Sequence, residues 1–200
     1  MSVKFLYSSA FGRLVCKFIQ KSGVFHIAAW YLKSPLSKPL IRNYISKNNI
    51  PMDDFPGVRF KSFADFFGRQ KSPYQFDQNP KSFISPCDSL LNIFKIKPDC
   101  ELPIKESLYK VSDLIPNEDV AGTFAGGMCF IFRLCASDYH HFCYVDDCEH
   151  TDDHFIQGMV HSVQPIACAS VPVYRLNRRQ WTILNTQNFG PVAQIEVGAL

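Results

Sequence analysis

The stretch MCFIFRLCASDYHHFCY, residues 128–144, sets the fold class and contains the densest polar cluster of the chain. Its first half, Met128–Leu134, is a short run of aromatic and β-branched residues, which is typical of a strand. Asp-Tyr-His-His follows at 138–141. We interpret the stretch as a strand that brings two imidazoles to a sheet edge, where acid–base chemistry near neutral pH is available. A solvated strand end is the alternative interpretation.

The sequence on either side of this stretch predicts the two halves of the fold. Leu90–Ile96, Val171–Leu176 and Trp181–Leu184 are further short apolar runs, separated by Pro, Gly, Asn or Asp, and indicate more strands. Residues 1–70 instead show helical spacing. We therefore expect an α+β fold, with a helical region at 1–70 and a β-rich region at 71–200.

The first 50 residues predict a basic amphipathic helix. Apolar residues recur at helical spacing from residue 5 to 32, past Gly23, while Arg13, Lys17 and Lys21 lie four residues apart on another face. Residues 1–50 contain eight Lys or Arg and no Asp or Glu, so their partner is expected to be an anionic surface. Such a helix lies in the headgroup region of a membrane, or it packs on its own domain with solvated lysines. Nucleic acid is not an expected partner, because exposed stacking aromatics do not accompany the basic residues.

Two shorter helices are predicted before residue 70. One covers Leu40–Lys47 and ends at two asparagines. The other covers Ser62–Phe67, with Ser62 as the N-cap, Asp65 in the capping-box position and Gly68 after the helix end.

Composition excludes several classes of protein. The 200 residues, 46% of them hydrophobic, can bury a core. No apolar run approaches the ~20 residues that a transmembrane helix needs. Arg13 and Lys17 interrupt any signal-peptide core, so the eight cysteines are expected to be reduced thiols in the cytosol.

A zinc-dependent hydrolase is a weaker alternative. The candidate ligands lie between residues 135 and 154, but C-x-x-C spacing is absent, so no metal is expected. These candidates are Cys135, His140, Cys143, Cys148, His150 and His154.

Two further segments could contribute to a site. Asp88 lies in the turn SPCDS, ahead of a predicted strand, although an Asp in a turn is common. His161 lies in GMVHSV, which we interpret as an apolar strand, where a lone His is more often a core residue than a catalyst.

Taken together and in order, nine segments resemble the phosphatidylserine decarboxylase family, in its branch with Cys three residues after Asp-Tyr-His. They are YISKNNI (44–50), FKSFADFFGR (60–69), SPCDS (85–89), YKVSDL (109–114), FIFRL (130–134), DYHHFCY (138–144), GMVHSV (158–163), NFG (188–190) and IEVGAL (195–200).

The resemblance implies a lyase of phospholipid biosynthesis. The family converts phosphatidylserine to phosphatidylethanolamine and CO2 through a Schiff base with a pyruvoyl group, which withdraws the electrons released by decarboxylation. That group forms when a zymogen cuts itself before the Ser of a Gly-Ser-Thr segment, and it then heads a small α chain.

The resemblance also implies roles for individual residues. Asp88 matches the Asp of the self-cleavage triad, and His140 matches the histidine of the decarboxylation step. Cys143 stands where many members have the triad His, and a thiol cannot easily act as that base. We hypothesise that His161 supplies the missing base.

No Gly-Ser-Thr occurs in the 200 residues. We therefore expect this chain to be the incomplete β-chain portion, inactive alone, whose pyruvoyl comes from a serine absent from it. The expected partners are phosphatidylserine, an anionic membrane surface on the cytoplasmic side, and an α chain; a homodimer is left open. The alternative is a catalytically inactive membrane-binding remnant or regulatory homologue.

Overall fold

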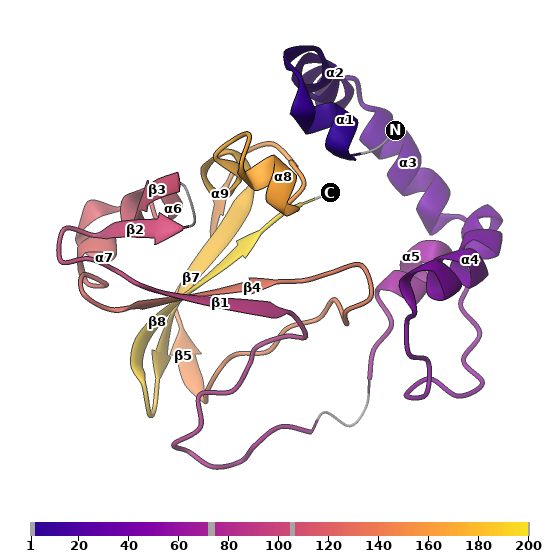
Figure 1. Cartoon of the computed structure of the whole chain (residues 1–200). Coiled ribbons are helices and arrows are strands. Elements are labelled where there is room, and N and C mark those ends of the chain that lie inside the picture. Colours follow the sequence, from indigo (N-terminus) through magenta and orange to yellow (C-terminus); the bar gives the residue numbers. More distant parts are fainter. Residues whose placement is uncertain (1–2, 72–74, 105–106, 200) are drawn as a thin grey trace. The chain divides into compact units, whose positions relative to one another are not determined.

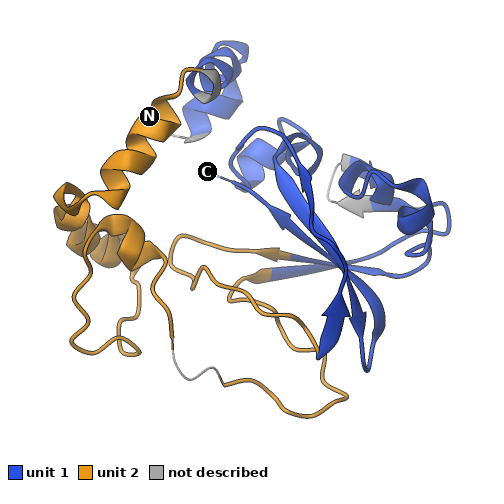
Figure 2. Ribbon diagram, turned by 180° about the vertical axis from the view of Figure 1, so that it is seen from behind, with its two compact units in different colours: residues 1–20, 91–131, 147–200 blue, residues 21–90, 132–146 orange. Residues whose placement is uncertain are grey.

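The computed structural model describes residues 3–71, 75–104 and 107–199 (Figure 1). The chain divides into two compact units, each assembled from separated segments (Figure 2). Unit 1 comprises 1–20, 91–131 and 147–200, and unit 2 comprises 21–90 and 132–146. The sequence predicts a boundary near residue 70, between a helical and a β-rich region, and this boundary stays a prediction.

The strands lie mainly in unit 1 and form three sheets. β7 and β8 form an antiparallel hairpin, in which Arg179 pairs with Val197 and Thr186 with Gly190. β5 and β6 pair with successive parts of β7, β1 pairs with β4, and β2 pairs antiparallel with β3. The strands are β1 (Leu90–Lys95), β2 (Glu101–Ile104), β3 (Ser107–Lys110), β4 (Met128–Arg133), β5 (Cys148–His150), β6 (His154–Ile156), β7 (Arg179–Thr186) and β8 (Gly190–Val197).

The predicted α+β class is confirmed, as are the strands at Leu90–Ile96, Met128–Leu134 and Trp181–Leu184. The strand predicted at Val171–Leu176 is wrong, because Val173–Leu176 form the one-turn helix α9. Pro172 has a helix-compatible φ of −74° and no N–H for a sheet. Its carbonyl accepts a hydrogen bond from the N–H of Leu176, at 3.0 Å.

Unit 1 contains two hydrophobic clusters. The larger lies among the strands and the short helices α6 (Val111–Leu114) and α7 (Glu118–Gly122). Its buried members are Ile96, Leu102, Tyr109, Val111, Leu114, Ile115, Ala121 and Trp181. The smaller joins the N-terminal helices to α8 (Pro165–Cys168) and α9, through Tyr7, Cys16, Ala167 and Val173.

The helix predicted from residue 5 to 32 is divided into α1 (Val3–Ser8), α2 (Ala10–Lys21) and α3 (Val24–Lys33). The first break has a local cause, since the Ser9 hydroxyl accepts a hydrogen bond from the Gly12 N–H at 3.0 Å and thereby starts α2. Gly12 also lies against the Phe5 carbonyl, where a Cβ would clash. The second break is at Gly23, whose φ of 73° is left-handed.

Unit 2 contains α3, the 3-10 turn η1 (Pro35–Ser37), α4 (Lys38–Asn48) and α5 (Phe63–Phe67). The helix predicted at Leu40–Lys47 is confirmed as α4, which ends at the left-handed residue Asn49. The helix predicted at Ser62–Phe67 is confirmed as α5. The Ser62 hydroxyl accepts from the Asp65 N–H at 3.2 Å.

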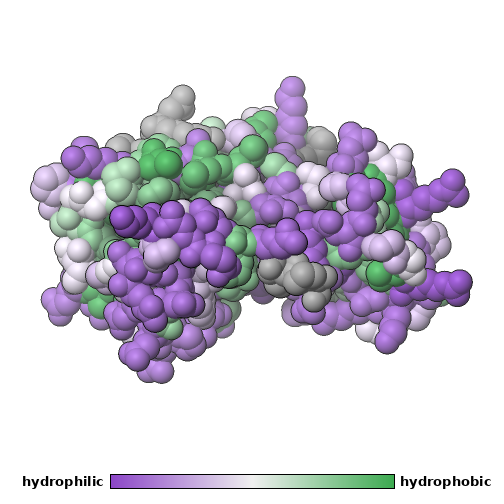
Figure 3. Space-filling view, turned by 90° about the horizontal axis from the view of Figure 1, so that it is seen from below, coloured by the Kyte–Doolittle hydropathy of each residue, from purple (hydrophilic) through white to green (hydrophobic). Residues whose placement is uncertain are grey.

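One face of the β1/β4 pair is apolar and exposed. Leu91 and Ile93 of β1 are 47% and 51% exposed, and Met128 and Phe130 of β4 are 52% and 38% exposed. The residues that alternate with them, including Phe94 and Ile131, pack on the larger core cluster. On the side of the molecule seen in Figure 3, hydrophobic residues form patches between hydrophilic ones.

Within residues 3–71, 75–104 and 107–199, no helix combines the length and apolar character that crossing a bilayer requires. All eight cysteines lie in these ranges, and none forms a disulfide.

Candidate active site

The Asp-Tyr-His-His segment lies in unit 2, beyond the end of β4. The prediction that it directly ends a strand is wrong, because β4 stops at Arg133 and a turn intervenes. Asp138 closes this turn, since its Oδ2 accepts from the Cys135 N–H at 2.6 Å and its own N–H donates to the Cys135 carbonyl at 3.1 Å. The segment is therefore fixed by an aspartate turn and has no sheet ladder of its own.

The imidazole of His140 is held by the same turn. Its Nε2 lies 3.1 Å from the Cys135 carbonyl oxygen. A carbonyl only accepts hydrogen bonds, so Nε2 is the donor and carries the proton of the neutral ring. Phe67 of α5 stacks on the ring, with centroids 4.3 Å apart and planes 30° apart.

The environment of His140 keeps it neutral. Burial lowers the pKa of His140 from its usual value of 6.5, while the Cys135 carbonyl and Asp138 act in the opposite direction. A ring that is uncharged at pH 7 can accept a proton during a reaction and give it back. His140 therefore has the properties that an acid–base residue needs.

The turn that carries Asp88 packs against the end of this segment. The backbone N–H of Cys143 donates to the Pro86 carbonyl at 2.8 Å, and its thiol contacts the same oxygen at 3.6 Å. Asp88 itself is exposed. The structure thus brings the Asp88 turn and the Asp138–Tyr144 segment together inside unit 2, without an Asp88–His140 bond.

The two thiols at this junction are poor bases. Burial raises the pKa of Cys87, and the neighbouring carboxylate of Asp88 raises it further. Burial also raises the pKa of Cys143 from its usual value of 9.0. Both thiols are therefore protonated at neutral pH.

His161 lies in unit 1, in irregular backbone. The strand predicted at Gly158–Val163 is therefore wrong; the described backbone here forms only an isolated bridge between Met159 and Asn177. The Asn177 amide accepts from the His161 N–H at 2.9 Å and donates to the His161 carbonyl at 2.8 Å. Because one side chain satisfies both backbone groups, no sheet neighbour is needed.

The side chain of His161 is 7% exposed and is bonded to Tyr7 of α1. The Tyr7 hydroxyl lies 3.0 Å from Nδ1 of His161 and accepts from the Ser162 N–H at 3.1 Å. Burial lowers the pKa of His161, so this ring is also neutral near pH 7. Both ring nitrogens and both backbone groups of His161 therefore have partners, and the contact to Tyr7 links α1 to the rest of unit 1.

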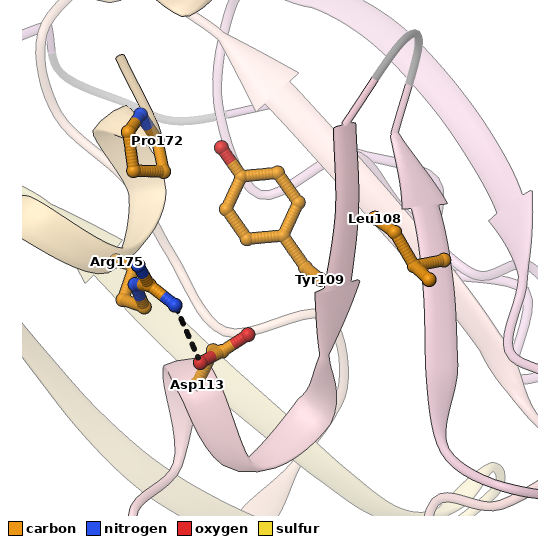
Figure 4. A pocket seen from close by; sticks show the side chains of 5 residues that line it. All are labelled: Leu108, Tyr109, Asp113, Pro172 and Arg175. Carbon is orange, nitrogen blue, oxygen red and sulfur yellow. Dashed lines mark ion pairs between the residues drawn. The ribbon is translucent and has the colours of Figure 1, made fainter.

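Two hollows of unit 1 contain none of Asp88, His140 and His161. One of about 240 Å³ is lined by Leu108, Tyr109, Asp113, Pro172 and Arg175, with an Asp113–Arg175 ion pair of 3.7 Å across it (Figure 4). A second of about 490 Å³ contains His154, which stacks on Trp181 with ring centroids 4.0 Å apart. Among the described residues, no three His, Cys, Asp or Glu side chains are grouped closely enough to hold a metal ion.

Sequence reasoning missed the residues that surround His140. Phe67, Arg69 and Lys71 all contact the Asp138–Tyr144 segment or support it, yet the sequence indicated only a capped helix there. Their signal was the FKSFADFFGR motif, whose function its helical spacing does not reveal.

Comparisons with known proteins show the family to which the chain belongs. The sequence profile of the family described as phosphatidylserine decarboxylase matches residues 63–200. Phosphatidylserine decarboxylase proenzyme 2 of Clostridium acetobutylicum is 36% identical over 201 residues, which cover 99% of this chain and 69% of that protein. The proenzyme of Clostridium perfringens SM101 is 35% identical (98% and 69%), and that of Desulfitobacterium hafniense Y51 is 32% identical (98% and 68%).

The profile covers more than half of the chain and includes the turn of Asp88, the segment of His140 and His161. The relatives span the N-terminal helices as well. By these matches the chain belongs to the phosphatidylserine decarboxylase family.

Proposed function

We propose that this chain acts in a phosphatidylserine decarboxylase, a carboxy-lyase that converts phosphatidylserine to phosphatidylethanolamine and CO2. The observation that carries the proposal is the neutral, half-buried His140, held in the DYHHFCY segment of a chain whose relatives are named decarboxylase proenzymes. The alternative of an inactive remnant is less well supported, because it gives no reason for this environment of His140.

His140 is the residue that we assign to proton transfer. When CO2 leaves, its former bonding electrons stay on the substrate carbon, and a proton must reach that atom. The Nε2–H of His140 is held by the Cys135 carbonyl, so Nδ1 is the atom that can take a proton from the ammonium group of the substrate and pass it to the carbon that CO2 leaves.

The family resemblance implies a pyruvoyl group, which supplies an electron sink for decarboxylation when it is present. The residues of unit 2 fit such chemistry, because an uncharged imidazole and the turn of the exposed Asp88 carboxylate belong to one packed loop cluster. We assign Asp88 to self-cleavage. The expected partner of this chain is an α chain that carries the pyruvoyl group.

We also propose His161 as the base of self-cleavage, since Cys143 is a protonated thiol. Its lowered pKa supports the proposal, because a neutral imidazole can accept the serine proton. In protein that carries the Gly-Ser-Thr segment, His161→Ala should block processing into two chains on a denaturing gel. Tyr7→Phe serves as the comparison, because it removes the contact to His161 but keeps the imidazole. Normal processing of His161→Ala excludes the role.

Peripheral membrane binding is proposed for the N-terminal helices, on the cytoplasmic side. In α2, Phe11, Leu14 and Phe18 are 66%, 65% and 74% exposed, and Arg13 and Lys17 are exposed as well. Apolar side chains with nearby cations suit an anionic bilayer surface. Replacing the three apolar residues by Ser should remove co-sedimentation with phosphatidylserine vesicles. Equal sedimentation of the variant and of the unaltered protein would contradict the proposal.

The decisive test measures CO2 release from phosphatidylserine by the processed protein. We expect release that His140→Ala abolishes. No release from correctly processed, folded protein would overturn the proposed function.

A further inference from the structure

The FKSFADFFGR motif takes no part in the function proposed above, yet its end lies on the His140 segment. Phe67 stacks on His140, and the next residues contact the neighbours of His140 on both sides. We infer that Phe67–Lys71 is a clamp, in which Phe67 is the positioning residue that fixes the plane of the His140 ring and thereby keeps its Nε2–H on the Cys135 carbonyl. This inference rests on the proposed role of His140.

Three contacts define the clamp, one each to Tyr139, His140 and His141. The backbone N–H of Lys71 donates to the Tyr139 hydroxyl at 2.8 Å. The Phe67 ring stacks on His140 at 4.3 Å. The Nε2 of His141 donates to the Gly68 carbonyl at 3.1 Å. Because the residues before and after His140 are tied to the same segment that stacks on it, the imidazole has little freedom to rotate.

Helix α5 is itself fixed, so the clamp has a rigid base. Phe66 is fully buried, and its ring meets those of Tyr44 and Phe60 edge-on at 6.2 and 5.3 Å. The buried Ser37 hydroxyl accepts from the Phe63 N–H at 2.9 Å. With the Ser62 cap, these contacts hold the start of the helix at one position and orientation.

Arg69 secures the other end of α5. It is 6% exposed, and its guanidinium lies 5.3 Å from the Phe55 ring centre and 5.0 Å from that of Phe66. It also donates to the Phe66 carbonyl at 3.4 Å, which is a helix-end acceptor. A cation between two aromatic faces resists displacement, so Gly68 and Lys71 are held where the His140 segment needs them.

The clamp has a chemical consequence. Stacking by Phe67 keeps water off one face of His140, and the Cys135 carbonyl holds the proton on Nε2. The charged or titratable groups that face the ring are Asp138 on its own segment, His141 beside it and Arg69 beyond α5. Asp138 favours the imidazolium, whereas burial, Arg69 and His141 favour the neutral ring. Together, these effects favour one neutral tautomer of His140, in which Nδ1 is the atom that can accept a proton.

The test follows the ring nitrogens of His140 by ¹⁵N NMR against pH, in unaltered protein and in two variants. Phe67→Leu removes the stack, and Phe76→Leu is the matched control, since Phe76 is a 54% exposed phenylalanine of the same unit. In unaltered protein we expect a single Nε2–H tautomer and a pKa below the usual 6.5. Phe67→Leu should raise that pKa and mix the tautomers, whereas Phe76→Leu should change neither.

In the processed enzyme, Phe67→Leu should lower kcat about tenfold or more with little change in KM, and should shift the acid limb of its pH profile. Phe67→Tyr, which keeps the stack, should restore both. A His140 in unaltered protein that titrates at or above 6.5 with both tautomers populated overturns the inference, whether or not any variant folds. So does a Phe67→Leu protein with an unchanged His140 titration. Because the NMR readout needs no turnover, loss of the inference and loss of the proposed function are distinguishable.

Discussion

His140 in unit 2 and His161 in unit 1 have the same direction of pKa shift and the same first cause, burial, but opposite surroundings. His161 is bonded through its ring and both backbone groups to Tyr7 and Asn177. His140 is half-buried, with one ring nitrogen on a carbonyl and one face on Phe67. A lowered pKa therefore does not by itself show which role a histidine has. The difference lies in what the ring atoms already bind.

The largest effect is expected from His140→Ala. Loss of a general acid–base residue should lower kcat for CO2 release by about 10²- to 10⁴-fold, with little loss of stability because the ring is only half-buried. Steady-state rates on phosphatidylserine measure it, with His26→Ala, an exposed histidine of α3, as the control. Equal losses in both variants would contradict the assignment of His140 to proton transfer.

Asn177→Ala tests the surroundings of His161. The fully buried Asn177 amide bonds both backbone groups of His161 and donates to the Gly198 carbonyl at 2.7 Å. Leaving these groups unpaired should lower the free energy of unfolding by about 3 kcal/mol. Urea denaturation measures the change, and Asn185→Ala, an exposed position on β7, should change it little. A neutral Asn177→Ala would show that His161 does not depend on this bonding.

Tyr7→Phe removes one hydroxyl from the same network and should have a smaller effect. The His161 ring and the Ser162 N–H would both lose a partner, which should cost about 1–3 kcal/mol of stability. Tyr31→Phe is the control, because its hydroxyl makes only an exposed contact of 3.4 Å. If the two variants are equally stable, α1 does not depend on the His161 contact.

The smallest effect concerns pH. Both histidines have pKa values below the usual 6.5 in the folded protein, so the unfolded chain binds more protons as the pH falls through 6.5. Stability should therefore be complete above that pH and decrease below it. The raised pKa of Glu196, caused by burial, acts in the opposite direction at lower pH. The urea concentration at the unfolding midpoint should decrease as the pH is lowered from 7.5 to 5.5, and it should decrease less in His161→Gln. A midpoint independent of pH in unaltered protein would contradict the direction of both shifts.

Local signals predicted much of this fold. The Ser62 cap, the asparagine after α4 and the alternating apolar runs of β1, β4 and β7 depend on neighbouring residues, and each was predicted from them. The errors at α9 and at His161 arose where distant contacts decide the backbone, since Val173 packs on Tyr7 and Asn177 replaces a sheet partner. His140 was predicted from the dense polar cluster after an apolar run and Asp88 from a turn before one, whereas their separate roles were implied only by the resemblance. The clamp joins residues 68 or more positions apart, which periodicity does not record.

The exposed face of the β1/β4 pair bears on how the protein behaves in solution. This two-stranded sheet exposes the apolar side chains of Leu91, Ile93, Met128 and Phe130 to water. Such a surface can bind other unfolded or apolar polypeptides through hydrophobic contacts. Aggregation during expression should therefore begin at this face and depend steeply on concentration. Solubility, and not fold stability, is then the quantity that a surface-engineered version should improve, by one charge at the centre of this face.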